Sequence, residues 1–143
     1  MMPARRPLVR VGGQTTQLPA GYRVVGAART VGAAFDGGGS DITVGAFCDV
    51  RIPFGLRIDR ATLVGSPAGS ITIDVRTGLL SNYPATASIC AGSPPALSGG
   101  AASENTALTA WSRVVAPDSI VRFVVTACSG VTQATVQIEG VDV

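Results

Sequence analysis

Apolar and polar residues alternate with a period of two along much of the chain. In the hexapeptide Ile-Thr-Ile-Asp-Val-Arg that begins at Ile71, every odd position is apolar and every even position is polar. Successive side chains of a β-strand point to opposite faces of a sheet, so Ile71, Ile73 and Val75 are expected to face a core. Residues 48–54 and 134–139 alternate in the same way. No window of 11 residues has a helical period, and the pattern therefore predicts an all-β protein.

The strand pattern predicts an antiparallel β-sandwich or jelly-roll-like domain of seven or eight strands. The alternating apolar residues fall on one face of the strand up to Ile58 and on the other face from Ala61 onward. This change of face indicates a β-bulge near Asp59 and Arg60. Residues 91–105, with their Pro-Pro and Gly-Gly pairs, are expected to form a long irregular loop that is functional or packs on a neighbour. Apart from a possible short strand over residues 22–26, which precedes the domain, the expected strands cover roughly residues 41–47, 48–54, 56–64, 70–77, 83–90, 107–115, 119–127 and 131–142. The first two of these could be one bent strand.

The first 21 residues differ from the rest in being rich in arginine and proline. Proline fixes φ and removes a hydrogen-bond donor, so residues 1–21 are expected to form an extended anchoring arm. A Gly-rich linker with room for a short strand is expected over residues 22–40, followed by the sandwich domain over residues 41–143. The arm residues expected to contact a partner are Arg5, Arg6, Leu8, Val9, Arg10, Val11, Leu18 and Pro19.

The composition argues against catalysis and against nucleic-acid binding. There is no histidine and no lysine, so a Ser-His triad and a Ser-Lys dyad are both excluded. A net charge of +2 provides no dense basic patch for a nucleic acid. A carboxylate pair is formally possible, but the candidates are each expected on the solvated face of a strand; they are Asp41, Asp49, Asp59 and Asp74. A calcium site at Asp36 and Asp41 is a further possibility, but no Asp-x-Asp-x-Asp-Gly spacing supports a calcium loop. We therefore expect no catalytic residue, no metal and no cofactor.

The sequence predicts no membrane segment, and it leaves the state of the three cysteines open. No apolar h-region follows the first ten residues, and the longest apolar runs are far shorter than the roughly 20 residues that span a bilayer. Cys48, Cys90 and Cys128 lie about forty residues apart, without the close pairs typical of zinc sites. Buried reduced thiols are expected, with a disulfide as the alternative.

Aromatic residues make up only 5% of the chain, and most of them are expected to pack in the core. Phe47, Phe54 and Phe123 are candidates for core packing, whereas Tyr83 and Trp111 are the two that could also contact a ligand such as a glycan. Charged residues are only 14% of the chain, which is low for a free monomer and favours an assembly.

Several segments from Asp41 onward are similar to a small β-sandwich module of tailed-bacteriophage structural proteins. They include DITVGAFCDVRIPFGLRI, ATLVGSPAGSITIDVRTG, YPAT, LTAWSRVVAPDSIVRFVVTACSGV and TQATVQIEGVDV. The leader RPLVRVGGQTTQLPAG separately resembles the N-terminus of phage fibre and virion proteins. The chain departs from the module at RTGLLSNYP, where relatives carry a Lys-rich aromatic stretch, so a ligand contact there does not carry over.

The resemblance implies a non-enzymatic virion component with repeated or trimeric subunits, made in the cytoplasm of a bacterial host and located on the particle surface. Combined with the arm and the compact β domain, it predicts a capsid decoration (cement) or head-fibre protein that binds the major capsid protein. The alternative is a tail-fibre, baseplate or tail-tip adaptor that binds tail proteins and whose sandwich contacts a host glycan. Neither prediction involves a membrane or a nucleic acid.

Overall fold

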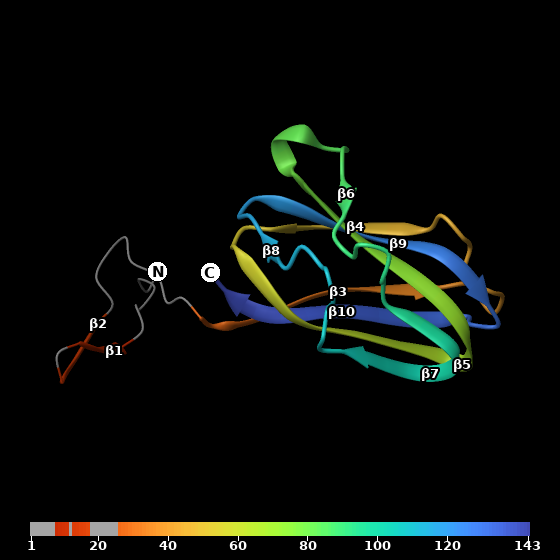
Figure 1. Ribbon diagram of the computed structural model, residues 1–143, viewed down its shortest axis with the longest axis horizontal. Helices are drawn as coiled ribbons and strands as arrows, with labels where there is room; N and C mark the ends of the chain where they lie inside the picture. The colour runs from red at the N-terminus through yellow and green to blue at the C-terminus, as the bar shows by residue number, and fades with distance from the viewer. Residues whose placement is uncertain (1–7, 12, 18–25) are drawn as a thin grey trace, which may run out of the picture.

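All ten strands of the described part of the chain are antiparallel, which confirms the predicted all-β class. The computed structural model describes residues 8–11, 13–17 and 26–143 (Figure 1). Along the chain the elements are β1 Leu8–Val11, β2 Gln14–Gln17, β3 Ala28–Asp36, β4 Phe47–Ile52, β5 Leu56–Leu79, the 3₁₀ turn η1 Leu80–Asn82, β6 Ala87–Ser88, β7 Ala96–Asn105, β8 Val114–Val115, β9 Ser119–Ser129 and β10 Gln133–Asp142. The strands β1 and β2 form a two-stranded sheet, and the other eight form a single sheet.

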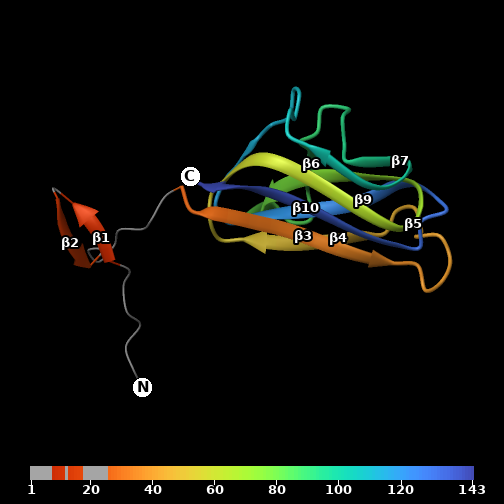
Figure 2. The ribbon, with the colours of Figure 1, turned by 90° about the horizontal axis from the view of Figure 1, so that it is seen from below.

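The eight-stranded sheet curls because one long strand belongs to both of its halves. Residues 56–66 of β5 pair with β10, and residues 70–79 pair with β9. The resulting order, β3-β10-β5-β9-β4, brings the two end strands β3 and β4 close together (Figure 2). The predicted sandwich is therefore one curled sheet, an open half-barrel whose two halves face each other across a single core.

The core lies between the two halves of this sheet and contains the residues that the alternation placed there. Ile71, Ile73 and Val75 are each at most 1% exposed, and Phe123 is fully buried. Phe54 is half-buried against the core. Phe47, which the sequence also assigns to the core, is 57% exposed. It begins the edge strand β4, and its ring lies beside the guanidinium of Arg122 instead.

The predicted bulge is present at Asp59. Glu139 of β10 is opposite Arg60, whereas the next residue, Gly140, is opposite Ile58, so Asp59 has no partner in the ladder. A β-carbon on Gly140 would lie 1.8 Å from the carbonyl oxygen of Arg57. Glycine is therefore required where β10 passes the bulge, since the two backbones approach too closely for any side chain.

Three of the predicted boundaries differ from the structure. The predicted linker 22–40 contains β3, which pairs with β10 over nine residues, so the folded sheet begins well before residue 41. The predicted irregular loop 91–105 contains β7, which pairs along β5. The strands predicted over 56–64 and 70–77 are one continuous strand, because the glycines between them bend the chain without ending the pairing. The ladders thus extend across segments whose local composition resembles a loop.

Some predicted strands are mostly irregular. Residues 41–46 form a turn before β4, and only β6 and β8 remain of the strands predicted over 83–90 and 107–115. Among the described residues, no helix has the length and apolarity needed to span a membrane.

Candidate functional site

The first candidate site is the hairpin formed by β1 and β2. Its register pairs Leu8 with Gln17 and Val11 with Gln14, and the turn between them uses Gly13 at a φ of 84°. Among the described strands, β1 and β2 pair only with each other. An isolated two-stranded hairpin is at best marginally stable in water.

The hairpin occupies the central part of the predicted arm. Residues 8–11 form a strand, in keeping with the extended backbone that the proline spacing indicates. The predicted contact residues Arg5, Arg6, Leu18 and Pro19 lie outside the described residues. Their contact with a partner, like that of Leu8, Val9, Arg10 and Val11, stays a prediction.

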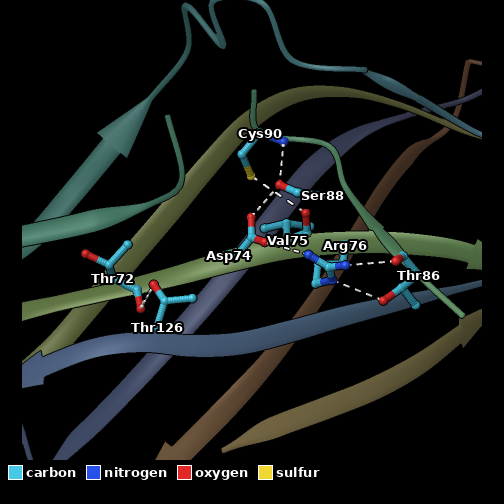
Figure 3. Close-up of polar contacts among 8 residues, drawn as sticks. All are labelled: Thr72, Asp74, Val75, Arg76, Thr86, Ser88, Cys90 and Thr126. Carbon is cyan, nitrogen blue, oxygen red and sulfur yellow. Dashed lines mark hydrogen bonds and ion pairs between the residues drawn. The ribbon is translucent and has the colours of Figure 1, made fainter. Parts of the chain in front are cut away.

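The second candidate site is the loop that leaves β5 at Leu79 and returns at Cys90. Arg76 donates hydrogen bonds to the Oγ1 of Thr86 at 3.1 Å and to its carbonyl oxygen at 2.8 Å (Figure 3). Ser88 donates to Asp74 at 2.7 Å, and the backbone N–H of Cys90 donates to the Oγ of Ser88 at 3.3 Å. These bonds tie the returning half of the loop to the outward face of β5.

The thiol of Cys90 lies under this loop. It is fully buried, and burial raises its pKa to about 12. A thiol with that pKa is protonated at neutral pH, whereas the thiolate is the form that attacks electrophiles and binds metals. Cys48 and Cys128 are half-buried, and all three cysteines are free thiols.

Tyr83, at the tip of the loop, reaches across to an ion pair on the neighbouring strands. Its hydroxyl donates to Oδ2 of Asp49 at 2.7 Å, and its ring is half exposed. Arg122 of β9 binds Asp49 of β4 through two hydrogen bonds of 2.7 and 2.9 Å, and its guanidinium lies 4.6 Å from the centre of the Phe47 ring. The structure therefore joins two exposed aromatic side chains, Tyr83 and Phe47, to opposite members of one bidentate salt bridge.

The salt bridge between Asp49 and Arg122 sets the protonation states of the cluster that these two residues form with Tyr83. Hydrogen bonds from Arg122 hold the pKa of Asp49 below its ordinary value. The hydrogen bond to the Asp49 carboxylate raises the pKa of Tyr83, because the phenol is held in its donor form. At neutral pH the cluster is thus a carboxylate, a guanidinium and a protonated phenol.

The two predicted ligand contacts differ in their surroundings. Trp111 is 6% exposed, and its indole N–H donates to the carbonyl oxygen of Ser93 at 3.0 Å, so it packs in the core. Of the two, Tyr83 alone presents its ring at the surface. Asp49 and Arg122 are 73 positions apart, and no local motif connects them. The available signal is Arg122 itself, the one charged residue of β9, because a charged side chain needs a partner when it is partly buried.

The described residues contain no cluster of three or more His, Cys, Asp or Glu side chains that could hold a metal ion. Asp36, a candidate calcium ligand in the sequence, accepts a hydrogen bond from the backbone N–H of Gly38 at 2.8 Å. Its second carboxylate oxygen accepts a long hydrogen bond from the side chain of Gln133 at 3.4 Å. Asp36 therefore closes the turn after β3.

No protein-family model matches the chain, and no curated protein matches it. Among solved structures, the chain has a weak similarity to a chain in the structure of infectious bursal disease virus, Gx strain, with a TM-score of 0.33 and 10% sequence identity. The match covers 95% of this chain and 42% of the viral chain.

Proposed function

We propose that this chain is a non-enzymatic structural protein of a bacteriophage particle, a capsid decoration or head-fibre protein that docks through its N-terminal arm. The observation that carries the proposal is the hairpin of residues 8–17. It pairs with no strand of the main sheet among the described residues, while the main sheet completes its own core without it. A segment of this kind is suited to binding a partner.

The hairpin offers two ways of binding. Each of its strands has an outer edge whose backbone donors and acceptors can extend a sheet of the partner, as in other cases of strand addition. The apolar residues of Leu8–Val11 can add buried area to those hydrogen bonds. Many copies on one particle would add avidity to an individually weak contact.

The surface chemistry supports a non-catalytic role. The charged side chains on the outer face of the β4, β9 and β5 strands are engaged with one another, as in the Arg122–Asp49 and Arg76–Asp74 pairs. Cys90 is held protonated. The proposal includes other virion proteins as partners and a homo-oligomer, such as a trimer, as the assembled form.

The test is deletion of residues 1–21 from the full chain. Particles grown without the chain are incubated with the purified wild-type or truncated protein, sedimented, and assayed for bound copies. A matched control replaces residues 1–21 with a Gly-Ser segment of equal length, which keeps the chain length and removes the hairpin. We expect both variants to keep the thermal unfolding transition of the main sheet and to lose binding.

Full occupancy by either variant would refute docking through the arm. Copy number then separates head from tail, because hundreds of copies per particle indicate decoration and a dozen or fewer indicate a tail position. A tail-fibre or baseplate adaptor that binds a glycan is the second candidate, and the exposed ring of Tyr83 favours it. In that case Tyr83→Ala would abolish binding to a host-glycan array, while Trp111→Phe would leave binding intact.

A further inference from the structure

The N-terminal segment joins the sheet at the end where β3 begins and β10 finishes (Figure 1). The backbone N–H of Gly26 donates to the carbonyl oxygen of Asp142 at 2.8 Å, and the N–H of Asp142 donates to the carbonyl oxygen of Ala27 at 2.9 Å. These two bonds fix the point at which the segment leaves the body. Whatever the hairpin binds is therefore tethered to this end of the sheet.

The same end carries a set of exposed apolar side chains. Val114 is 66% exposed, Leu80 44% and Val143 41%. Leu80 donates a backbone hydrogen bond to Asp118 at 2.9 Å, Val143 donates one to Gly55 at 3.1 Å, and Val114 pairs with Arg57 at the start of β5. We use the term end face for the surface formed by Pro53, Phe54, Leu80, Val114, Pro117 and Val143.

A hollow of about 670 Å³ opens on the end face between the loops after β4 and before β9. Phe54 and Pro117 line it, and the guanidinium of Arg29 lies 5.0 Å from the centre of the Phe54 ring. Arg29 also pairs with the buried carboxylate of Asp142 at 3.3 Å. The hollow is thus an apolar recess whose charged groups are already neutralised.

The charges on the end face determine which class of partner fits it. Arg29 is paired with Asp142, and Arg51 is paired with Asp118 at 2.5 Å. Internally compensated charges give no net attraction for a nucleic acid or an anionic bilayer, both of which require unpaired basic residues. An exposed apolar patch with a weakly charged rim is typical of a protein interface.

The chain between the hairpin and the sheet is short, so the hairpin cannot lie far from the end face. Gly26 follows Gln17 by nine positions, so the hairpin lies within about 30 Å of the end face even if the chain between them is fully extended. A surface that binds the hairpin is therefore close enough to meet the end face. Two contacts joined by a short tether reinforce each other through a high effective concentration.

We infer that the end face docks on the same weakly charged protein surface that binds the hairpin, so that the sheet stands end-on upon the particle. The inference rests on the proposed function and adds to it the face of the body that meets the partner. In this arrangement the opposite end of the sheet, with the loop between β3 and β4, stays exposed.

The test uses Val114→Asp and Leu80→Asp in the full chain, with Val44→Asp as the matched control. Val44 is 57% exposed and lies in the loop between β3 and β4, at the opposite end of the sheet. The probe is the chain-free particle of the preceding experiment, and the measurement is the dissociation constant from sedimentation. Each end-face variant is expected to weaken binding roughly ten-fold or more, and Val44→Asp to leave it unchanged.

The outcomes separate the inference from the proposed function. If deletion of residues 1–21 abolishes binding but all three Asp variants bind like the wild type, the end-on arrangement is wrong and arm docking stands. If the wild type itself does not bind, the proposed function fails and the inference fails with it. If light scattering shows that Val114→Asp or Leu80→Asp dissociates an oligomer of the purified chain, the end face is an interface between copies, which also overturns the inference.

Discussion

Substitution of Gly140 by alanine tests the bulge on which the end of the sheet depends. The added β-carbon would lie 1.8 Å from the carbonyl oxygen and 2.7 Å from the carbonyl carbon of Arg57. Both atoms belong to the backbone, so no side chain can rotate away to relieve the contact. The strands must separate by about 1.2 Å to bring the oxygen to 3.0 Å, the shortest distance that real β-carbons adopt.

That separation would disrupt the ladder beyond the bulge. Gly140, Val141 and Asp142 pair with Ile58, Arg57 and Leu56, the last residues of the β10–β5 register. Loss of two or three backbone hydrogen bonds at about 1 kcal/mol each, with loosened packing of the adjacent core, destabilises the protein by about 3 kcal/mol. For a folded body of this size that corresponds to a decrease in Tm of about 10 °C.

The assay is thermal unfolding followed by far-ultraviolet circular dichroism, with Gly100→Ala as the control. Gly100 lies in β7 and has no positive φ, and a β-carbon added there would have no heavy atom within 4 Å. Alanine is therefore expected to be neutral or slightly stabilising at this position. If Gly140→Ala unfolds within about 2 °C of the wild type, the close approach to Arg57 is absent and the bulge at Asp59 is misplaced.

Two further predictions concern the titratable groups. Because Arg122 lowers the folded-state pKa of Asp49, this carboxylate stabilises the protein above its unfolded pKa of about 3.9, and the contribution is lost as the pH falls through the lower folded value. The difference in urea midpoint between wild type and Asp49→Asn should therefore be larger at pH 6 than at pH 2, and equal differences would contradict the salt bridge. Because burial raises the pKa of Cys90 to about 12, its thiol should not react with a disulfide reagent at pH 8 until the protein is unfolded. Loss of a fast-reacting thiol in Cys90→Ala would show that the site is open.

The features that the sequence predicted correctly are those encoded by neighbouring residues. The period-two pattern located Ile71, Ile73 and Val75 on the buried face because strand geometry alone sets that alternation. The bulge was visible as a change of parity between Ile58 and Ala61, since an extra residue exchanges the two faces of a strand. Neither prediction required knowledge of the partner strand.

The features that it missed depend on distant pairing. The segment Ala96–Asn105 is made largely of Ala, Gly and Ser, and it becomes β7 only because β5 offers an unpaired edge. The glycines within β5 resembled a turn but serve close packing instead. A β-carbon on Gly69 would lie 2.7 Å from the carbonyl oxygen of Ser129, and one on Gly65 would lie 2.9 Å from Cδ1 of Leu97.

The candidate site was predictable only in part for the same reason. The sequence names Tyr83 as one of two aromatic residues that could contact a ligand, but its partner Asp49 comes from a strand 34 residues away. Trp111 illustrates the converse case. Its single polar atom is satisfied by the carbonyl oxygen of Ser93, which permits near-complete burial of a ring that the sequence left available for a ligand.

The connection between the arm and the sheet has a mechanical consequence for the proposed docking. The chain enters the main sheet through β3, which pairs with β10 along nine consecutive residues. Hydrogen bonds of an antiparallel ladder are perpendicular to the strands, so a pull on the arm along β3 loads the whole ladder at once rather than opening it bond by bond. Through β10 the load reaches β5, which spans both halves of the sheet. If the arm docks as proposed, a pull through the arm would be shared by the whole β3–β10 ladder, so the body would resist unfolding from the end at which the arm enters.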